Sequence, residues 1–428
     1  MQDHPILSKV FLGYSPMIDR QRAVIATRLT IFPERPDADI DAHALLAALA
    51  EVSPSGAEPG AAPAGPTLSL NLRPLDPAAV KARAAAEALP PVSLNVAGES
   101  LLHAVLAAQP GPHLMVEVPA FMATDAKNAA MLQALQAAGS TLLIKGRPVA
   151  EVPQSVLACF AHAIVDADEA RRQTAGTGPA LRGLSVVQSG VRTLSAVETA
   201  FKGGAIATLG WPLDDPVVRP AGRSSVPQDV QVVLELISGV DREAHVTQLE
   251  AVLKKDPTLA FRLMRYLNSP AFGLSVEISS FGHALMLLGY QRLKRWLALL
   301  LASSAKEINA KPVMFAAVRR GLLMEELVRS NGDVEMRGEV FICGVFSLLD
   351  RLLKQPFADL FKSVPVPEKV SQALQGESGP FHPYLELVRA IESESVFDIR
   401  ERADKLFMTP AEVNRALLQA LSAARALE

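Results

Sequence analysis

Hydrophobic positions in the first half of the chain form short runs, separated by stretches with a helical pattern. The separating stretches include residues 41–52 and 128–138, which are rich in Ala and Leu. Strands that alternate with helices of this length predict βαβ units and a parallel sheet. Because the runs are largely apolar, we expect a sheet that is covered on both faces or closed into a barrel. The strand-like runs are VFLGYSPMI, AVIATRLTIF, PVSLNV, HLMVEV, STLLIK, AHAIVD and GLSVVQ.

The pattern changes after residue 228, where strand-like runs give way to helical periodicity. A cluster of helix and strand breakers, DDPVVRPAGRSSVPQ, marks the change. We therefore expect an α/β domain at 1–213, a linker at 214–228 and an all-α domain at 229–428. One helix is predicted to begin at Asp256-Pro257, and another to end at Gly289. The apolar residues with helical spacing are Leu259, Leu263, Met264, Leu267, Leu293, Trp296, Leu297 and Leu300.

Length and composition narrow the classes of protein. A chain of 428 residues exceeds one ordinary core, and 49% hydrophobic residues are enough to bury more than one. The net charge of −3 argues against a general binder of nucleic acid or anionic membrane. The two cysteines, Cys159 and Cys343, offer no disulfide framework and indicate a reducing compartment. We find no signal peptide and no apolar run of membrane-spanning length, so we expect a cytoplasmic protein without membrane association.

The helical half resembles the HDOD family. The stretch at 256–301, DPTLAFRLMRYLNSPAFGLSVEISSFGHALMLLGYQRLKRWLALLL, resembles its signature, and FICGVFSLLDRLL at 341–353 resembles its later core helix. The resemblance covers about 226–410. It implies kinship with HD-type phosphohydrolases, whose His-Asp pair binds catalytic metal. Here that position falls at Ser347-Leu348, so the resemblance implies no metal site and no cofactor.

The first half resembles the EAL family, a TIM-type barrel that hydrolyses cyclic di-GMP with two divalent metals. The resemblance covers about 8–213 and is carried, in the family's order, by YSPMIDRQRAVIATRL, SLNV, VEV, STLLIKG, QSGVRT and TLGW. The implied fold is therefore a degenerate (β/α) barrel followed by an all-helical domain. The residues at the family's motif positions are Arg28, Asn95, Glu117, Lys145, Gly146, Ser189, Arg192 and Leu209.

The chemistry of these positions differs from the family pattern. Arg28 replaces the Glu of Glu-Ala-Leu, Lys145 replaces an aspartate, and Arg192 replaces a glutamate. Cationic side chains there oppose metal binding by Coulomb repulsion. Asn95 and Glu117 fall on metal-ligand positions, and we interpret them as relics held by hydrogen bonds or ion pairs. Alternatively, the three cations cradle an anion, because Arg and Lys suit phosphate.

The two resemblances imply a catalytically inactive scaffold of bacterial signalling that acts by binding other signalling proteins. The alternative is a receptor that binds cyclic di-GMP or another nucleotide without hydrolysis, and an active phosphodiesterase ranks behind it. The sequence also leaves open whether the chain forms a homodimer. The candidate partner surface is Tyr290, Arg292 and Arg295, since aromatic and Arg residues are enriched at interface hot spots. The same basic cluster also fits a solvated helix face, and a DNA-binding helix-turn-helix is the weakest interpretation.

Overall fold

The computed structural model describes residues 4–35, 38–50, 92–111, 114–148, 150–172, 181, 183–217, 228–253, 255, 281–302, 308–330, 332–362, 366–376 and 379–425. The chain divides into two compact units, which are described separately. The first unit comprises Met1–Gly56, Lys81–Asp215 and Arg389–Leu418. The second comprises Ala57–Val80, Pro216–Val388 and Gln419–Glu428.

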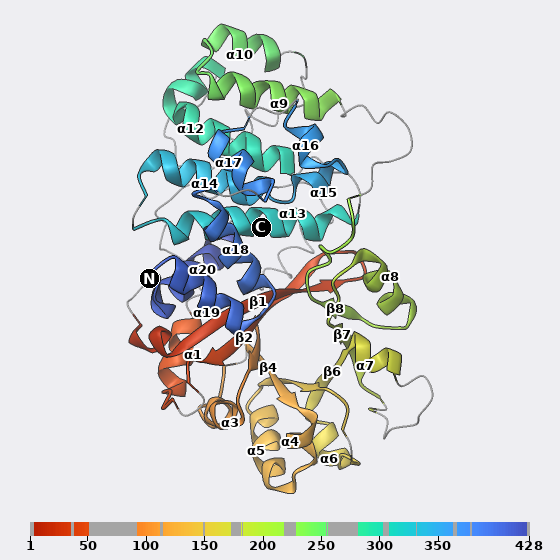
Figure 1. The fold of residues 1–428 in the computed structure, drawn as a ribbon. Helices are drawn as coiled ribbons and strands as arrows, with labels where there is room; N and C mark the ends of the chain where they lie inside the picture. The colour runs from red at the N-terminus through yellow and green to blue at the C-terminus, as the bar shows by residue number, and fades with distance from the viewer. Residues whose placement is uncertain are drawn as a thin grey trace. The chain divides into compact units, whose positions relative to one another are not determined.

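The first unit is a closed barrel whose strands follow one another in sequence order (Figure 1). Each strand-like run of the sequence forms a strand, and TLGW contributes to the last one, so the predicted barrel is confirmed. The strands are β1 Val10–Asp19, β2 Val24–Pro33, β3 Val92–Val96, β4 Leu114–Pro119, β5 Thr141–Lys145, β6 Phe160–Asp166, β7 Ser185–Ser189 and β8 Ala207–Leu209.

The first strand departs from the predicted parallel sheet. β1 pairs antiparallel with both β2 and β8, whereas the other neighbouring strands pair parallel. A tight turn links β1 to β2, in which the Asp19 carboxylate accepts a hydrogen bond from the amide of Ala23 at 2.8 Å. A parallel pair requires a crossover of a dozen or more residues, and this connection is far shorter. The wholly parallel expectation is therefore wrong at β1.

Short helices surround the barrel, and several of its strands contribute buried side chains to an apolar cluster. That cluster contains Met17, Ala26, Leu143, Ile164, Val187, Ala207 and Leu209. The helical segments from the first part of the chain are η1 Pro5–Lys9, α1 Ala42–Ala50, α3 Glu99–Ala107, α4 Ala120–Thr124, α5 Ala126–Ala137, α6 Gln154–Leu157, α7 Ala167–Arg172 and α8 Leu194–Lys202.

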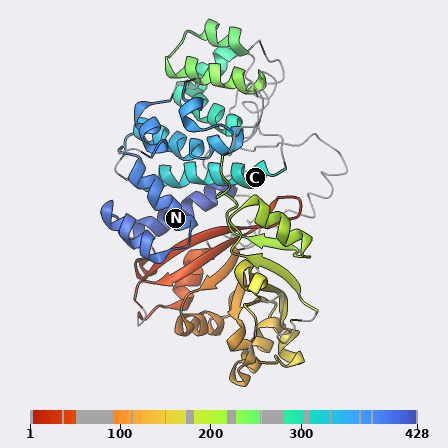
Figure 2. The same ribbon diagram turned by 45° about the vertical axis from the view of Figure 1, so that its right-hand side comes forward.

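Two helices from the end of the chain also belong to the barrel unit: α19 (Val396–Lys405) and most of α20 (Pro410–Arg425). Figures 1 and 2 show them, in blue, beside the red β1 and β2. The guanidinium of Arg400 lies 5.5 Å from the ring of Phe11 and donates to the carbonyl of Glu34. The predicted boundaries at 213 and 229 stay a prediction, because the linker lies largely outside the described residues.

The second unit is helical throughout its described residues. Within α12 the backbone leaves helical geometry at Gly289 (φ 71°, ψ 165°), which confirms the helix end predicted there. Leu293, Trp296, Leu297 and Leu300 are buried, as their spacing predicts, whereas the helix predicted from Asp256 lies outside the described residues. The helices are α9 Gln228–Asp241, α10 Val246–Leu253, α12 Phe281–Ala302, α13 Ala310–Leu327, α14 Val334–Phe346, α15 Leu349–Leu353, α16 Phe357–Leu360, α17 Glu368–Leu374 and α18 His382–Glu392, the last of which runs on into the first unit.

In the part of the chain that the structure describes, none of the helices combines the length and apolar character needed to cross a membrane.

Candidate functional site

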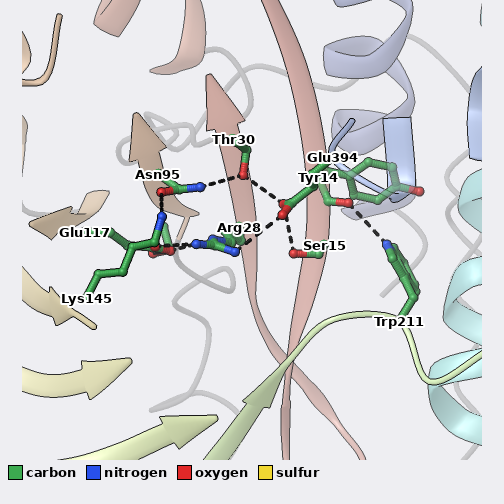
Figure 3. A network of polar contacts seen from close by, with 10 residues as sticks. Tyr14, Ser15, Arg28, Thr30, Asn95, Glu117, Lys145, Trp211 and Glu394 are labelled. Atoms are coloured by element: carbon green, nitrogen blue, oxygen red, sulfur yellow. Dashed lines mark hydrogen bonds and ion pairs between the residues drawn. The ribbon is translucent and has the colours of Figure 1, made fainter. Parts of the chain in front are cut away.

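Several of the predicted site residues meet inside the barrel, near the carboxyl ends of β3, β4 and β5 (Figure 3). Parallel strands direct these ends to one edge, which brings Asn95, Glu117 and Lys145 together from three neighbouring strands. Arg28 joins them from β2, where it lies opposite Ser15 of β1. In (β/α) barrels this end carries the active site.

Arg28 and Glu117 form a bidentate ion pair at the centre of the network. The guanidinium Nε donates to Oε1 of Glu117 at 2.8 Å, and Nη2 donates to Oε2 at 2.7 Å. Ser93 donates to the same Oε1 at 3.2 Å. The Glu117 side chain has no solvent exposure, and that of Arg28 has 9%. Both carboxylate oxygens are therefore already engaged by cationic or hydroxyl donors of this chain.

Lys145 and Asn95 form the second half of the network. The ammonium of Lys145 donates to Oδ1 of Asn95 at 2.7 Å. The amide nitrogen of Asn95 in turn donates to the hydroxyl of Thr30 at 3.0 Å. The relic interpretation of Asn95 and Glu117 thus agrees with the geometry, since each is held by a cationic side chain of the barrel.

The chain's C-terminal part supplies a residue that the sequence motifs did not indicate. Glu394 lies between α18 and α19, and its Oε1 accepts hydrogen bonds from Ser15 at 3.0 Å and Thr30 at 2.9 Å. Its other oxygen lies 3.4 Å from Nη1 of Arg28. None of the motif segments named above includes this position, and it lies more than 360 residues along the chain from Arg28.

Burial and charge shift the two cations in opposite directions. Burial by itself would lower the pKa of Arg28, but the carboxylates of Glu117 and Glu394 outweigh burial and raise it. Burial lowers the pKa of Lys145, and the positive charge of Arg28 lowers it further. The guanidinium therefore stays charged, whereas the lysine is the cation that loses its proton more readily.

The remaining predicted positions of the barrel do not join this network. Gly146 follows β5 with a φ of 80°, and Ser189 ends β7 half-buried. Arg192 is exposed and pairs with Asp214. Leu209 belongs to the apolar cluster. The anion cradle predicted from three cations therefore gathers only Arg28 and Lys145.

The TLGW motif forms a tight joint against β1. Gly210 has a φ of 130°, and a Cβ there would lie 2.3 Å from the carbonyl oxygen of Val191, so the position requires glycine. The indole of Trp211 then donates to the carbonyl of Tyr14 at 3.2 Å, and the two rings meet edge to face. The motif thus serves barrel closure here.

The two metals that the EAL resemblance implies do not fit these residues. A divalent pair needs free anionic oxygens. Arg28 occupies both oxygens of Glu117, and Lys145 occupies the oxygen of Asn95. Both cations would also repel a metal ion at such short range. Among the described residues, no group of three or more His, Cys, Asp or Glu side chains is placed to hold a metal.

The expected His-Asp position lies at a helix junction in the second unit. α14 ends at Phe346 and α15 begins at Leu349, so the segment at 341–353 that resembles the family's later core helix comprises parts of two helices joined at Ser347-Leu348. The hydroxyl of Ser347 donates back to the carbonyl of Gly344 at 2.7 Å, a local bond that competes with helix continuation. It also accepts from Arg320 at 3.1 Å, and Leu348 beside it is buried. The chemistry at this position is therefore a guanidinium–hydroxyl contact.

The candidate partner surface is engaged within its own unit. The hydroxyl of Tyr290 donates to the carbonyl of Ala244 at 3.1 Å. Arg295 pairs with Glu325 at 2.8 Å and lies 4.1 Å from the ring of Phe341. Both residues are half-buried, and the side chain of Arg292 lies outside the described part. The role of this surface in binding a partner stays a prediction.

Comparison with known proteins identifies the second half. Residues 225–359 match the model of the HDOD domain, which confirms the family resemblance over most of the predicted range. The chain is 27% identical over 221 residues to the uncharacterized protein YuxH of Bacillus subtilis, covering 50% of this chain and 53% of YuxH. It is 26% identical over 178 residues to the cyclic di-GMP phosphodiesterase CdgJ of Vibrio cholerae, covering 42% of this chain and 41% of CdgJ. The matched stretches thus span about half or less of each relative's length.

Among solved structures, the barrel half is similar to EAL-type proteins. The PaMucR phosphodiesterase in complex with c-di-GMP is 16% identical with a TM-score of 0.32, covering 49% of this chain and 92% of that one. The EAL domain of Mycobacterium smegmatis DcpA is 17% identical with a TM-score of 0.31, covering 48% and 92%. The HDOD match follows a closed barrel whose strands carry the residues that resemble the EAL motifs.

Proposed function

We propose that this chain is a regulator in cyclic di-GMP signalling that does not hydrolyse the nucleotide and acts by binding other signalling proteins. The observation that carries the proposal is the Arg28–Glu117 pair. A carboxylate at a metal-ligand position of the EAL pattern is neutralised by an arginine at another motif position. The barrel then keeps its fold while its polar centre is filled by the chain's own ion pairs.

The HDOD match and the names of the relatives support a place in this signalling system. The name of CdgJ also favours a second candidate, a cyclic di-GMP phosphodiesterase. The two candidates differ in one measurable property. Purified chain supplied with magnesium or manganese and cyclic di-GMP is expected to form no linear dinucleotide above a blank without protein. Metal-dependent turnover would favour the second candidate.

Binding of protein partners is tested on the helical unit. Once a partner is identified, the double substitution Tyr290→Ala with Arg292→Glu is expected to weaken its capture about ten-fold, or about 1.4 kcal/mol. Tyr290→Phe removes only the hydrogen bond to Ala244 and measures its cost in stability separately. Arg192→Glu, on the exposed outside of the barrel, is the matched charge reversal and is expected to leave capture intact. The proposed surface would be contradicted if Arg192→Glu lost capture of the partner while the Tyr290/Arg292 double variant kept it.

A further inference from the structure

The backbone of Glu394 adopts a conformation that L-residues rarely take. Its φ is 55°, and it follows the end of α18, where its amide donates to the carbonyl of Ile391 and the amide of Ser395 to that of Ala390. Helices commonly end in this way with a glycine at the left-handed position. Strain of this kind persists where the surroundings hold the residue in place.

The strand beneath Glu394 accommodates its close approach. A Cβ on Gly13 would lie 3.1 Å from the Cα of Glu394 and 3.1 Å from the carbonyl oxygen of Ile391. Glycine at position 13 therefore allows the turn to lie directly on β1. The left-handed turn at Glu394 and the absence of a side chain at Gly13 together allow the carboxylate of Glu394 to reach into the barrel.

Three side chains donate hydrogen bonds to the carboxylate of Glu394. Ser15, Thr30 and Arg28 all point at the oxygens of Glu394 (Figure 3). Because Asn95 donates to the Thr30 hydroxyl, the proton of that hydroxyl is left to point at Glu394. Hydroxyl and guanidinium donors around one point suit an anionic group such as a carboxylate or a phosphate.

The charges of the network balance only when Glu394 is present. Arg28 and Lys145 supply two positive charges, and Glu117 supplies one negative charge that is fully committed to Arg28. Glu394 is the second negative charge, and its side chain keeps 18% exposure. Without it, the partly buried centre would carry a net positive charge and three donors lacking their acceptor.

We propose that Ser15, Thr30 and Arg28 form an anion-binding cradle that the chain fills with its own Glu394. A phosphate-bearing ligand then enters the cradle only when the segment Arg389–Leu418 leaves β1, so ligand binding and docking of this segment exclude each other. The proposal does not depend on whether the chain hydrolyses cyclic di-GMP, because its readouts are binding and segment exposure.

The test uses the full chain with Glu394→Gly, which removes the carboxylate and suits the left-handed backbone. Titration calorimetry with inorganic phosphate at constant ionic strength is expected to show binding at least about ten-fold tighter than in the unsubstituted chain. Glu401→Gln, which removes a charge from an exposed position of α19, is the matched control and is expected to behave like the unsubstituted chain. Adding Ser15→Ala and Thr30→Val to Glu394→Gly is expected to abolish the gain. Cyclic di-GMP titrated in parallel shows whether a dinucleotide or only a free anion is accepted.

Hydrogen exchange supplies a second readout if Glu394→Gly folds poorly. In the isosteric variant Glu394→Gln, exchange in Arg389–Leu418 and in β1 is expected to rise at least about five-fold over Glu401→Gln, because local opening becomes easier. Unchanged exchange would overturn the proposal. The proposal would also be overturned if a folded Glu394→Gly variant bound phosphate no better than the unsubstituted chain. The same holds if the variant that also lacks the hydroxyls of Ser15 and Thr30 bound phosphate as tightly as Glu394→Gly.

Discussion

The side chain of Asn414 forms hydrogen bonds with the backbone of β1 at Leu12, as a neighbouring strand would, although 402 positions separate the two residues. Its Oδ1 accepts the amide of Leu12 at 3.0 Å, and its Nδ2 donates to the carbonyls of Leu7 and Val10. β1 pairs with β8 only from Met17 onward, so this stretch of strand edge faces α20. One amide group thus satisfies backbone groups that β8 does not reach.

Replacement of Asn414 by Ala is expected to lower the free energy of unfolding by about 2–3 kcal/mol, because buried backbone donors and acceptors lose their partner. Urea denaturation measures the loss, followed by the fluorescence of Trp211, which contacts β1, in a Trp296→Phe background that leaves Trp211 as the only tryptophan of the chain. Gln419→Ala, on a half-buried position of the same helix, is the control. Because Ala favours the helix at both positions, an equal loss in both variants would show that the loss does not come from the hydrogen bonds of Asn414.

The barrel unit is expected to hold its C-terminal segment after the chain is cut. Proteolysis between residues 214 and 228 should give two fragments that elute together, because Arg389–Leu418 remains part of the barrel unit. Size-exclusion chromatography of the nicked protein, before and after about 4 M urea, measures their association. Separate elution without urea would mean that the segment does not belong to the barrel in solution.

The Arg28–Glu117 pair is expected to be costly to break and cheaper to remove. Arg28→Met leaves the fully buried Glu117 carboxylate without its partner, and loss of one partner of a buried pair costs about 3–5 kcal/mol. The double variant Arg28→Met with Glu117→Leu should regain most of that stability, since two apolar side chains replace two charges. Chemical denaturation of both single variants and the double variant gives the comparison. Additive losses would contradict the pairing.

The depressed pKa of Lys145 predicts a pH dependence with a definite sign. Its pKa in the folded state lies below the ordinary 10.5, chiefly through burial and then through Arg28. Between the two values the unfolded chain binds more protons, so the residue's contribution to the free energy of unfolding rises with pH. The unsubstituted chain should therefore gain stability relative to Lys145→Gln as pH rises toward the ordinary lysine pKa of 10.5. Lys202→Gln, exposed at the end of α8, controls for loss of charge, and an opposite trend would contradict the burial of the ammonium.

The sequence predicted those features of the fold and the site that leave a pattern among residues close together along the chain. Apolar runs predicted β1 to β7, because burial on both faces leaves a continuous hydrophobic signal, whereas the short β8 was indicated only by the TLGW motif. The EAL resemblance placed Arg28, Asn95, Glu117 and Lys145 at the family's motif positions, and the structure brings them together because parallel strands align their carboxyl ends. The antiparallel β1 was missed although the short link before Val24 excludes a crossover.

Other features left no local signal. Glu394 has no partner nearby in sequence, and the donors that hold it come from β1 and β2. Asn414 reads as an ordinary polar residue of an amphipathic helix. Arg192 was expected beside the other cations, but a strand-end position does not determine where a long side chain turns, and Asp214 holds it outside.

The most direct test of the account is a cyclic di-GMP hydrolysis assay on the full chain with magnesium or manganese, run beside Glu117→Ala. Because Arg28 engages both oxygens of Glu117, we predict no linear dinucleotide product above the protein-free blank from either protein. Metal-dependent turnover by the unsubstituted chain that disappears in Glu117→Ala would show that Glu117 serves catalysis, and would contradict the central claim.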